Sequence, residues 1–192
     1  MAAISVSKKS ISELTESGIK DSKLLSPKKR QSLYGHIINI AESICICRIG
    51  IEDIDFHVFK NNLNLLEAEA MAITIGNMKS DKTYVDSCDV NPSRYQRTIR
   101  GFLGQHDTRI VSMHHADRLN VVVSGASIIA KVIRDSEISK IRVQYGDIGS
   151  GYPSDKKTIR FVKDWYSQKN EIPPFARKSW KPAQLIVSGS NT

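Results

Sequence analysis

The chain has 192 residues, of which 40% are hydrophobic and 25% are charged, as is typical of a globular protein with one domain, with or without a short appendage. No apolar run approaches the length of a membrane span, and the first residues lack the pattern of a signal peptide, so we expect neither insertion into a membrane nor secretion. The net charge of +8 is compatible with a polyanionic partner, and equally with a merely basic soluble protein.

The cysteines, Cys45, Cys47 and Cys88, are odd in number and lack the spacing of a disulfide framework. Cys45 and Cys47 lie in an alternating apolar run, and no second Cys or His pair has the spacing of a zinc site. Buried thiols are therefore favoured over metal ligands. A reducing, cytoplasmic location fits this pattern.

The first third of the chain is predicted to begin with a strand and continue with a helix. Residues 1–6 are apolar and β-prone. Ser26 followed by proline is typical of a helix start, and apolar residues at helical spacing predict a helix of about four turns over residues 27–44. Residues 45–51 alternate and predict a strand, whereas residues 53–61 are ambiguous.

The middle of the chain contains the next four predicted elements. A capping box predicts that Asn64 opens a helix, with Leu66, Ala70 and Ile73 on its inward face. Residues 82–86 predict a strand, and the Asn-Pro pair at residue 91 starts a helix to about residue 102. Residues 109–113 predict another strand. Strands that alternate with helices predict an α/β domain with a covered sheet.

Residues 116–135 are the stretch around which the other predicted elements are organised. The apolar run 121–123 ends at Ser124, which is predicted to be a helix N-cap because its hydroxyl can accept a backbone N–H. Asp117 precedes this helix, either as an acid that faces a wet cleft or pairs with a cation, or as a turn residue before a core helix. The predicted inward face is small and apolar: Ala126, Ile129, Ala130 and Ile133.

The C-terminal part is predicted to contain a loop, a helix and a basic tail. Residues 149–153 form the loop, and Ser154 is predicted to cap a helix. Tyr152 in the loop either stacks on a sugar or base or packs against its own loop. Trp180 in the tail from Pro173 is either a nucleic-acid contact or part of a docked tail.

Two aspartates follow predicted strands and are candidate metal ligands. Asp86 ends one strand and Asp117 follows another, and sites in α/β sheets are built at strand ends. Their carboxylates suit Mg²⁺ or Mn²⁺, which support phosphodiester cleavage, although two carboxylates are too few for a two-metal site. Asp89 is assigned to the turn before the next helix. His114 and His115 are adjacent, so in a strand at most one of them faces the site.

A basic cluster surrounds the predicted helix start near Ser26. Helix N-termini and lysines both suit phosphates, but a solvated, charged helix end explains the cluster equally well. Its members are Lys20, Lys23, Lys28, Lys29 and Arg30.

Together these motifs resemble the ribonuclease HII family, in particular its archaeal branch. They occur in the family's order over nearly the whole chain: Asp21-Ser22-Lys23 with the residues up to Lys28, Tyr84-Val85-Asp86, His114-His115-Ala116-Asp117 with residues 123–131, Gly149–Asp155, and Arg177–Lys181.

The resemblance implies a ribonuclease H-like mixed sheet flanked by helices over residues 1–170, followed by a basic tail at 171–192. It implies an endonuclease that cleaves RNA in RNA–DNA hybrids and single ribonucleotides in duplex DNA by two-metal hydrolysis, leaving 3′-hydroxyl and 5′-phosphate ends. Asp86 and Asp117 would be catalytic Mn²⁺ or Mg²⁺ ligands, Lys23 a phosphate contact and Tyr152 a substrate-reading residue. We expect a cytoplasmic monomer; whether a sliding clamp is a partner is not readable from the sequence.

The sequence departs from the family at its start. The family opens with a strand that bears Asp-Glu-Ala-Gly-Arg-Gly and supplies two further catalytic carboxylates, and the printed sequence contains no such run. Residues 1–6 align with the family's second strand, so the strands beside the first would have unpaired backbone groups. His115 replaces a usual Lys and Gly125 a usual Ala, and both changes look tolerable.

Three hypotheses follow from this departure. The first is a hybrid-specific endonuclease whose reading frame extends upstream of Met1, and the second is a catalytically silent module that binds hybrids. The third is a non-functional fragment of an α/β domain. Coding DNA upstream of Met1 with an in-frame Asp-Glu-Ala-Gly-Arg-Gly would favour the first.

Overall fold

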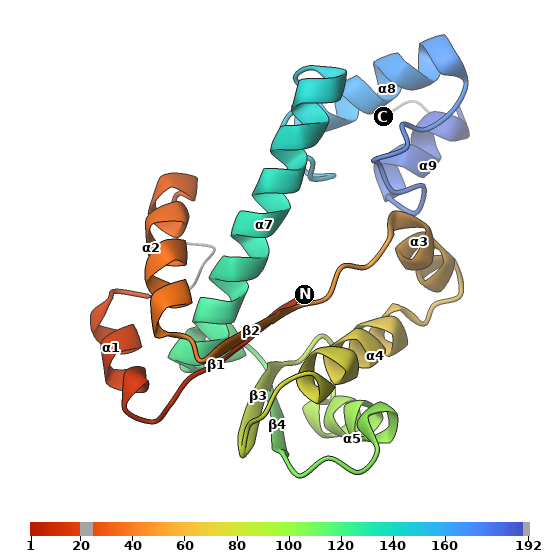
Figure 1. Cartoon of the computed structure of the whole chain (residues 1–192). Coiled ribbons are helices and arrows are strands. Elements are labelled where there is room, and N and C mark those ends of the chain that lie inside the picture. The colour runs from red at the N-terminus through yellow and green to blue at the C-terminus, as the bar shows by residue number, and fades with distance from the viewer. Residues whose placement is uncertain (20–24, 190–192) are drawn as a thin grey trace. The chain divides into compact units, whose positions relative to one another are not determined.

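The computed structural model describes residues 1–19 and 25–189 and has an α/β fold (Figure 1). The chain forms two compact units. Unit 1 contains residues 1–48 and 64–133, and unit 2 contains residues 49–63 and 134–192. The division at residue 170 that the sequence suggested stays a prediction.

Unit 1 contains two pairs of strands. β1 (Ala2–Ser5) pairs antiparallel with β2 (Ser43–Ile46), and Ala3 lies opposite Cys45. β3 (Lys82–Asp86) pairs in parallel with β4 (Arg109–Met113). The β3 and β4 bounds agree with the prediction. β2 begins and ends earlier than predicted, because the preceding helix ends at Ile40 instead of continuing to residue 44, and the next helix already begins at Ile51. Within residues 1–19 and 25–189, each strand pairs with one other strand.

One hydrophobic core of unit 1 lies beside β1. It contains buried residues of α1 (Ser10–Glu16), α2 (Pro27–Ile40) and the first half of α7 (Val121–Tyr145). α2 begins as predicted, because the Ser26 side chain accepts a hydrogen bond from Lys29 N at 3.2 Å. α7 packs closely on β1: a Cβ on Gly125 would lie 2.9 Å from Ile4 Cδ1, so an alanine there would require the end of that side chain to move.

A second core of unit 1 lies beside β3 and β4. α4 (Leu63–Gly76) and α5 (Pro92–Leu103) contribute its helical residues. The Asn91 side chain caps α5 as predicted. Two predictions for α4 were wrong: the helix starts at Leu63, before Asn64, and Ile73 is 53% exposed. Ala70 is buried as predicted, and the α4 residues of the second core are Ala68, Ala72 and Ile75.

The predicted N-cap of the long helix was also wrong. A short helix, α6 (Ala116–Leu119), is followed at once by α7, which begins at Val121. The Asn120 side chain accepts hydrogen bonds from Val122 N and Val123 N at 2.9 and 3.3 Å. Ser124 is therefore a buried residue inside the helix. The side chains of Asn120 and Ser124 are both suitable helix caps. Asn120 is the cap because the chain turns there, directly after α6.

Unit 2 contains α3 (Ile51–Phe59), α8 (Lys156–Lys169), α9 (Lys181–Val187) and the second half of α7. Val162 of α8 is fully buried against residues of the C-terminal segment, and Trp180 packs on this core, so the tail is docked. Asp55 of α3 is buried and accepts hydrogen bonds from Lys178 N and Ser179 N at 2.7 and 3.0 Å. Among the described helices, none is long and apolar enough to cross a membrane.

Candidate active site

The structure brings Asp86 and Asp117 together in unit 1. Asp86, the last residue of β3, accepts a hydrogen bond on Oδ1 from Ala116 N at 3.0 Å, and Asp117 is the next residue of α6. The Asp86 carboxylate thereby joins the end of β3 to the start of α6. Asp86 is exposed, whereas Asp117 is only 4% exposed, and both line one groove.

This groove has a volume of about 890 Å³ and lies along two strand edges. Residues 1–8 and 78–86 line it without a gap, whereas β2 and β4 contribute no lining residue. A strand that presented a face would contribute alternate residues, so consecutive residues indicate that β1 and β3 present their edges. Neither of these edges pairs with a further strand in the part of the chain that the structure describes.

The rest of the groove lining comes from helices of the two cores. α4 contributes Met71 and Ile75, and α7 contributes small and apolar residues. The α7 residues are Val122, Val123, Ala126, Ser127 and Ala130. The predicted inward positions Ala126 and Ala130 therefore face the groove, while Ile129 is buried in the first core. The apolar walls of the groove would suit an extended polypeptide segment, and the carboxylates of Asp86 and Asp117 would suit a cation.

Two titratable side chains near Asp86, the exposed Cys88 and the buried Tyr95, have raised pKa values. Burial is the largest cause that raises the pKa of the Cys88 thiol to about 12, with a further contribution from a hydrogen bond to Glu67. Burial also raises the pKa of the Tyr95 phenol, with the Cys88 hydrogen bond and the charges of Glu67 and Asp86 acting in the same direction. Cys88 and Tyr95 are therefore neutral near pH 7.

Asp89, His114 and His115, which were not predicted to be metal ligands, make local contacts outside the pair of aspartates. Asp89 accepts hydrogen bonds from Asn91 N at 2.8 Å and from Arg94, so it belongs to the predicted turn. His114 and His115 follow β4 instead of lying in it. His115 has a left-handed backbone with φ 55° as the cap of α6, and His114 Nε2 lies 3.3 Å from Val90 O.

The donor atoms at the groove suit a hard divalent cation in type but not in number. Mg²⁺ is commonly bound through one or two carboxylates together with waters and substrate phosphates, which fits Asp86 and Asp117. In the described part of the chain, no three His, Cys, Asp or Glu side chains are grouped as metal ligands. The residues present therefore fit part of a metal site, and a two-metal site requires further carboxylates.

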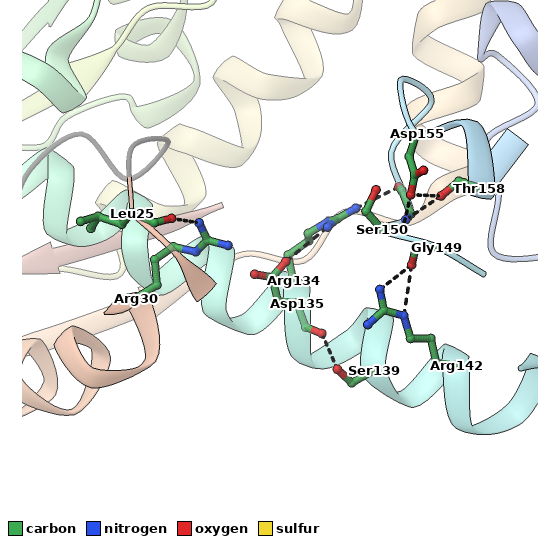
Figure 2. A network of polar contacts seen from close by, with 11 residues as sticks. Leu25, Arg30, Arg134, Asp135, Ser139, Arg142, Gly149, Ser150, Asp155 and Thr158 are labelled. Atoms are coloured by element: carbon green, nitrogen blue, oxygen red, sulfur yellow. Dashed lines mark hydrogen bonds and ion pairs between the residues drawn. The ribbon is translucent and has the colours of Figure 1, made fainter. Parts of the chain in front are cut away.

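Tyr152 lies in unit 2, in a loop that polar contacts fasten to α7 and α8. Figure 2 shows Arg142 reaching Gly149, and Asp155 reaching Ser150 and Thr158. Asp155, not the predicted Ser154, caps α8, because its side chain accepts a hydrogen bond from Lys157 N at 2.9 Å. Gly149 has φ +74°, and a Cβ there would lie 2.6 Å from the Asp155 carboxylate, so the turn requires glycine.

Asp155 should make the stability of unit 2 depend on pH. Backbone hydrogen bonds, first that of Ser150, lower the pKa of this carboxyl well below its usual range. A lowered folded-state pKa gives stability that is present above the unfolded-state pKa of about 3.9 and is lost as pH falls toward the folded-state value. We expect Asp155→Asn to lower the melting temperature at pH 7, and the difference from the wild type to shrink at pH 3. Thermal melts followed by circular dichroism measure this.

The control for that comparison is Asp164→Asn. Asp164 is an exposed residue of α8 that lies 3.9 Å from Arg160, and it contacts no atom of the loop in the interactions described above. Its melting temperature should follow the wild type at both pH values. A constant Asp155→Asn deficit from pH 7 to pH 3 would contradict the assigned role.

The predicted phosphate contact of Lys23 and the basic cluster near Ser26 are only partly covered by the described residues. Lys23 lies outside the described residues, as does Lys20, so the phosphate contact stays a prediction. Lys28 and Lys29 are exposed at the start of α2, and Arg30 Nη1 donates to Leu25 O at 2.7 Å (Figure 2). Arg134 and Arg142, which fasten the Tyr152 loop, were not among the predicted site residues. A helix with two arginines near a glycine-rich loop was the available signal.

Comparisons with known proteins agree with this architecture. The sequence model of the family described as Ribonuclease HII matches residues 1–183. Ribonuclease HII of Cenarchaeum symbiosum is 43% identical over 189 residues, which cover 98% of this chain and 90% of that protein.

Two solved structures are also similar. The ribonuclease H2 of Pyrococcus horikoshii OT3 has a TM-score of 0.87 at 36% identity, covering 97% of this chain and 89% of that one. Ribonuclease HII of Archaeoglobus fulgidus, solved in a complex with PCNA, has a TM-score of 0.83 at 34% identity, covering 96% of this chain and 86% of that one. The chain described here therefore belongs to the ribonuclease HII family and has its ribonuclease H-like fold and endonuclease class.

Proposed function

We propose that this chain acts in an endonuclease that cleaves the RNA strand of RNA–DNA hybrids and single ribonucleotides in duplex DNA. The observation that carries the proposal is the pairing of Asp86 and Asp117 at one end of the groove, where the Asp86 carboxylate accepts the Ala116 N–H. The products would have 3′-hydroxyl and 5′-phosphate ends.

In this proposal Asp86 and Asp117 hold Mn²⁺ or Mg²⁺. Such a cation would supply activation of a water and stabilisation of the charge on the leaving oxygen. The hydrogen bond to Ala116 N restrains Asp86, and burial restrains Asp117, so both carboxylates are held in place before a cation binds. Lys23 and Tyr152 would contact the phosphate and the sugar of the nucleic acid.

Among residues 1–19 and 25–189, Asp86 and Asp117 alone are proposed as metal ligands, fewer than a two-metal site requires. We propose that an extended strand in the groove would pair with the edges of β1 and β3 and bring the remaining carboxylates, as the Asp-Glu pair does in the family. Backbone groups that are buried without a partner cost about 1–3 kcal/mol each, and a strand would satisfy those along the two edges. The strand would also join the two cores of unit 1.

The 192-residue polypeptide alone should therefore cleave weakly or not at all, because metal affinity depends on the number and charge of the ligands. The measurement is nicking of a duplex that contains one ribonucleotide, with Mn²⁺ and with Mg²⁺. Binding of the same duplex, measured by fluorescence anisotropy, should be retained. Robust nicking by the polypeptide alone would show that residues 1–192 contain a complete site.

A catalytically silent hybrid-binding module is the second candidate function. The net charge of +8 and the exposed Tyr152 favour it, because neither depends on metal binding. The two candidates differ in their response to a strand that carries the missing carboxylates: the endonuclease gains activity, and the binding module does not.

A further inference from the structure

Arg134 of α7 lies across the ring of Tyr152. Its guanidinium carbon is 3.6 Å from the ring centroid, within the range of a cation–π contact. Its Nη2 donates to Gly151 O at 2.9 Å, and its Nη1 lies 3.3 Å from Asp135 Oδ1. Three contacts therefore orient one planar guanidinium, which Figure 2 shows extending from α7.

The backbone of the Tyr152 loop is held on α7 at two points. Arg142 Nε and Nη2 donate to Gly149 O at 3.1 and 2.5 Å. Gly151 has φ +72°, and a Cβ there would lie 2.5 Å from Ile138 Cδ1, so the loop lies directly on the helix. Arg134 and Arg142 thus both fasten the loop, but among the contacts of the described residues only that of Arg134 reaches the ring.

Tyr152 is still 44% exposed although Arg134 covers one side of the ring. A fixed aromatic ring loses little conformational entropy when it stacks on a sugar or base. A guanidinium beside the ring adds a positive charge that attracts phosphate. Both properties suit a nucleic acid better than a neutral small molecule.

We propose that Arg134 is a positioning residue that presents the Tyr152 ring for stacking on nucleic acid. It fixes the ring from one side and brings its charge next to the strand that stacks on the other side. The inference rests on the proposed function and extends it, because it assigns a residue that neither the sequence motifs nor the metal site includes. A residue that merely fastened the loop would act as Arg142 does.

The test measures binding of a duplex that contains one ribonucleotide, by fluorescence anisotropy at one fixed salt concentration. Tyr152→Ala should weaken binding about tenfold, since loss of one stacking contact costs about 1–3 kcal/mol. Arg134→Gln should weaken it about fivefold, and Arg142→Gln, which removes the same charge and a loop contact but no ring contact, less than about twofold. The double variant Arg134→Gln/Tyr152→Ala should bind no more than about twofold more weakly than Tyr152→Ala alone, because the ring contact is already lost and only the charge of Arg134 remains to be removed.

The outcomes separate this inference from the proposed function. Equal losses in Arg134→Gln and Arg142→Gln, or additive losses in the double variant, would overturn the positioning role while leaving the nuclease proposal intact. A wild-type chain that fails to bind the duplex would overturn both. Melting temperatures of all variants, measured in parallel, show whether a loss of binding reflects unfolding, and a folded Tyr152→Phe variant with wild-type affinity would confirm that the ring and not its hydroxyl is used.

Discussion

A synthetic strand added to the 192-residue polypeptide should switch on nicking at a single ribonucleotide. The strand peptide would carry a run of alternating valine and threonine followed by Asp-Glu-Ala-Gly-Arg-Gly. The valine and threonine residues favour extended backbone between the edges of β1 and β3, and the Asp-Glu pair would lie at the end of β3 with Asp86 and Asp117. We expect the single-turnover rate to rise about 100-fold or more, because the peptide completes the set of carboxylate ligands for the metal.

Two control peptides make this experiment specific. A peptide with Asn-Gln in place of Asp-Glu should bind the polypeptide equally well, measured by anisotropy of a labelled peptide, but should not support nicking. A scrambled peptide should do neither. Joining the active strand ahead of Met1 by a short linker raises its effective concentration to about the millimolar range, so weak binding in trans would not hide the effect. Tight binding of the active peptide without nicking would contradict the endonuclease assignment and favour the silent module.

In the completed protein, Asp86→Asn and Asp117→Asn should each abolish turnover. An amide of the same shape keeps the packing but loses the negative charge that holds a divalent cation. Replacement of a residue that only hydrogen-bonds to a metal ligand lowers metal affinity or activity about 10–100-fold. Loss of a ligand itself should therefore lower the rate about 100-fold or more. Single-turnover nicking of the ribonucleotide duplex with saturating Mn²⁺ measures the rate.

Binding of the duplex should be largely retained in both variants, because the proposed stacking and phosphate contacts do not involve these carboxylates. Asp107→Asn, a change of the same kind at an exposed residue before β4, should leave the rate unchanged. A near-normal rate in either Asp86→Asn or Asp117→Asn would remove that residue from the proposed site. Because Asp117 is buried, its variant also needs a melting curve to show that it is folded.

Local signals in the sequence were sufficient for most elements of the fold. The bounds of β3 and β4 follow from short β-prone runs, and the start of α5 follows from the Asn-Pro pair. These signals act over a few residues, so no distant contact is needed to read them. The family's motifs then predicted the ribonuclease H-like fold and the endonuclease class, which the comparisons confirm.

The same signals failed where a distant contact decides between local alternatives. Ser124 has the right chemistry for a cap, but the chain has already entered α7 at Val121 because Asn120 caps it. Ile73 has helical spacing for an inward position, yet it is exposed, because α4 turns Ala68 and Ala72 into the second core of unit 1. Capping and burial depend on which neighbour the helix meets, and one sequence does not contain that information.

For this protein, the sequence by itself determined the order of the elements, the family and the two aspartates that follow strands. The tertiary structure alone decided that Asp86 bonds to the backbone next to Asp117, that β1 and β3 present open edges to one groove, and that Arg134 covers the Tyr152 ring. The physical reason is the separation along the chain of the residues that interact. Hydrogen bonds within a helix or turn join residues that are near one another in the sequence. The groove and the ring contact are set by residues that only folding brings together.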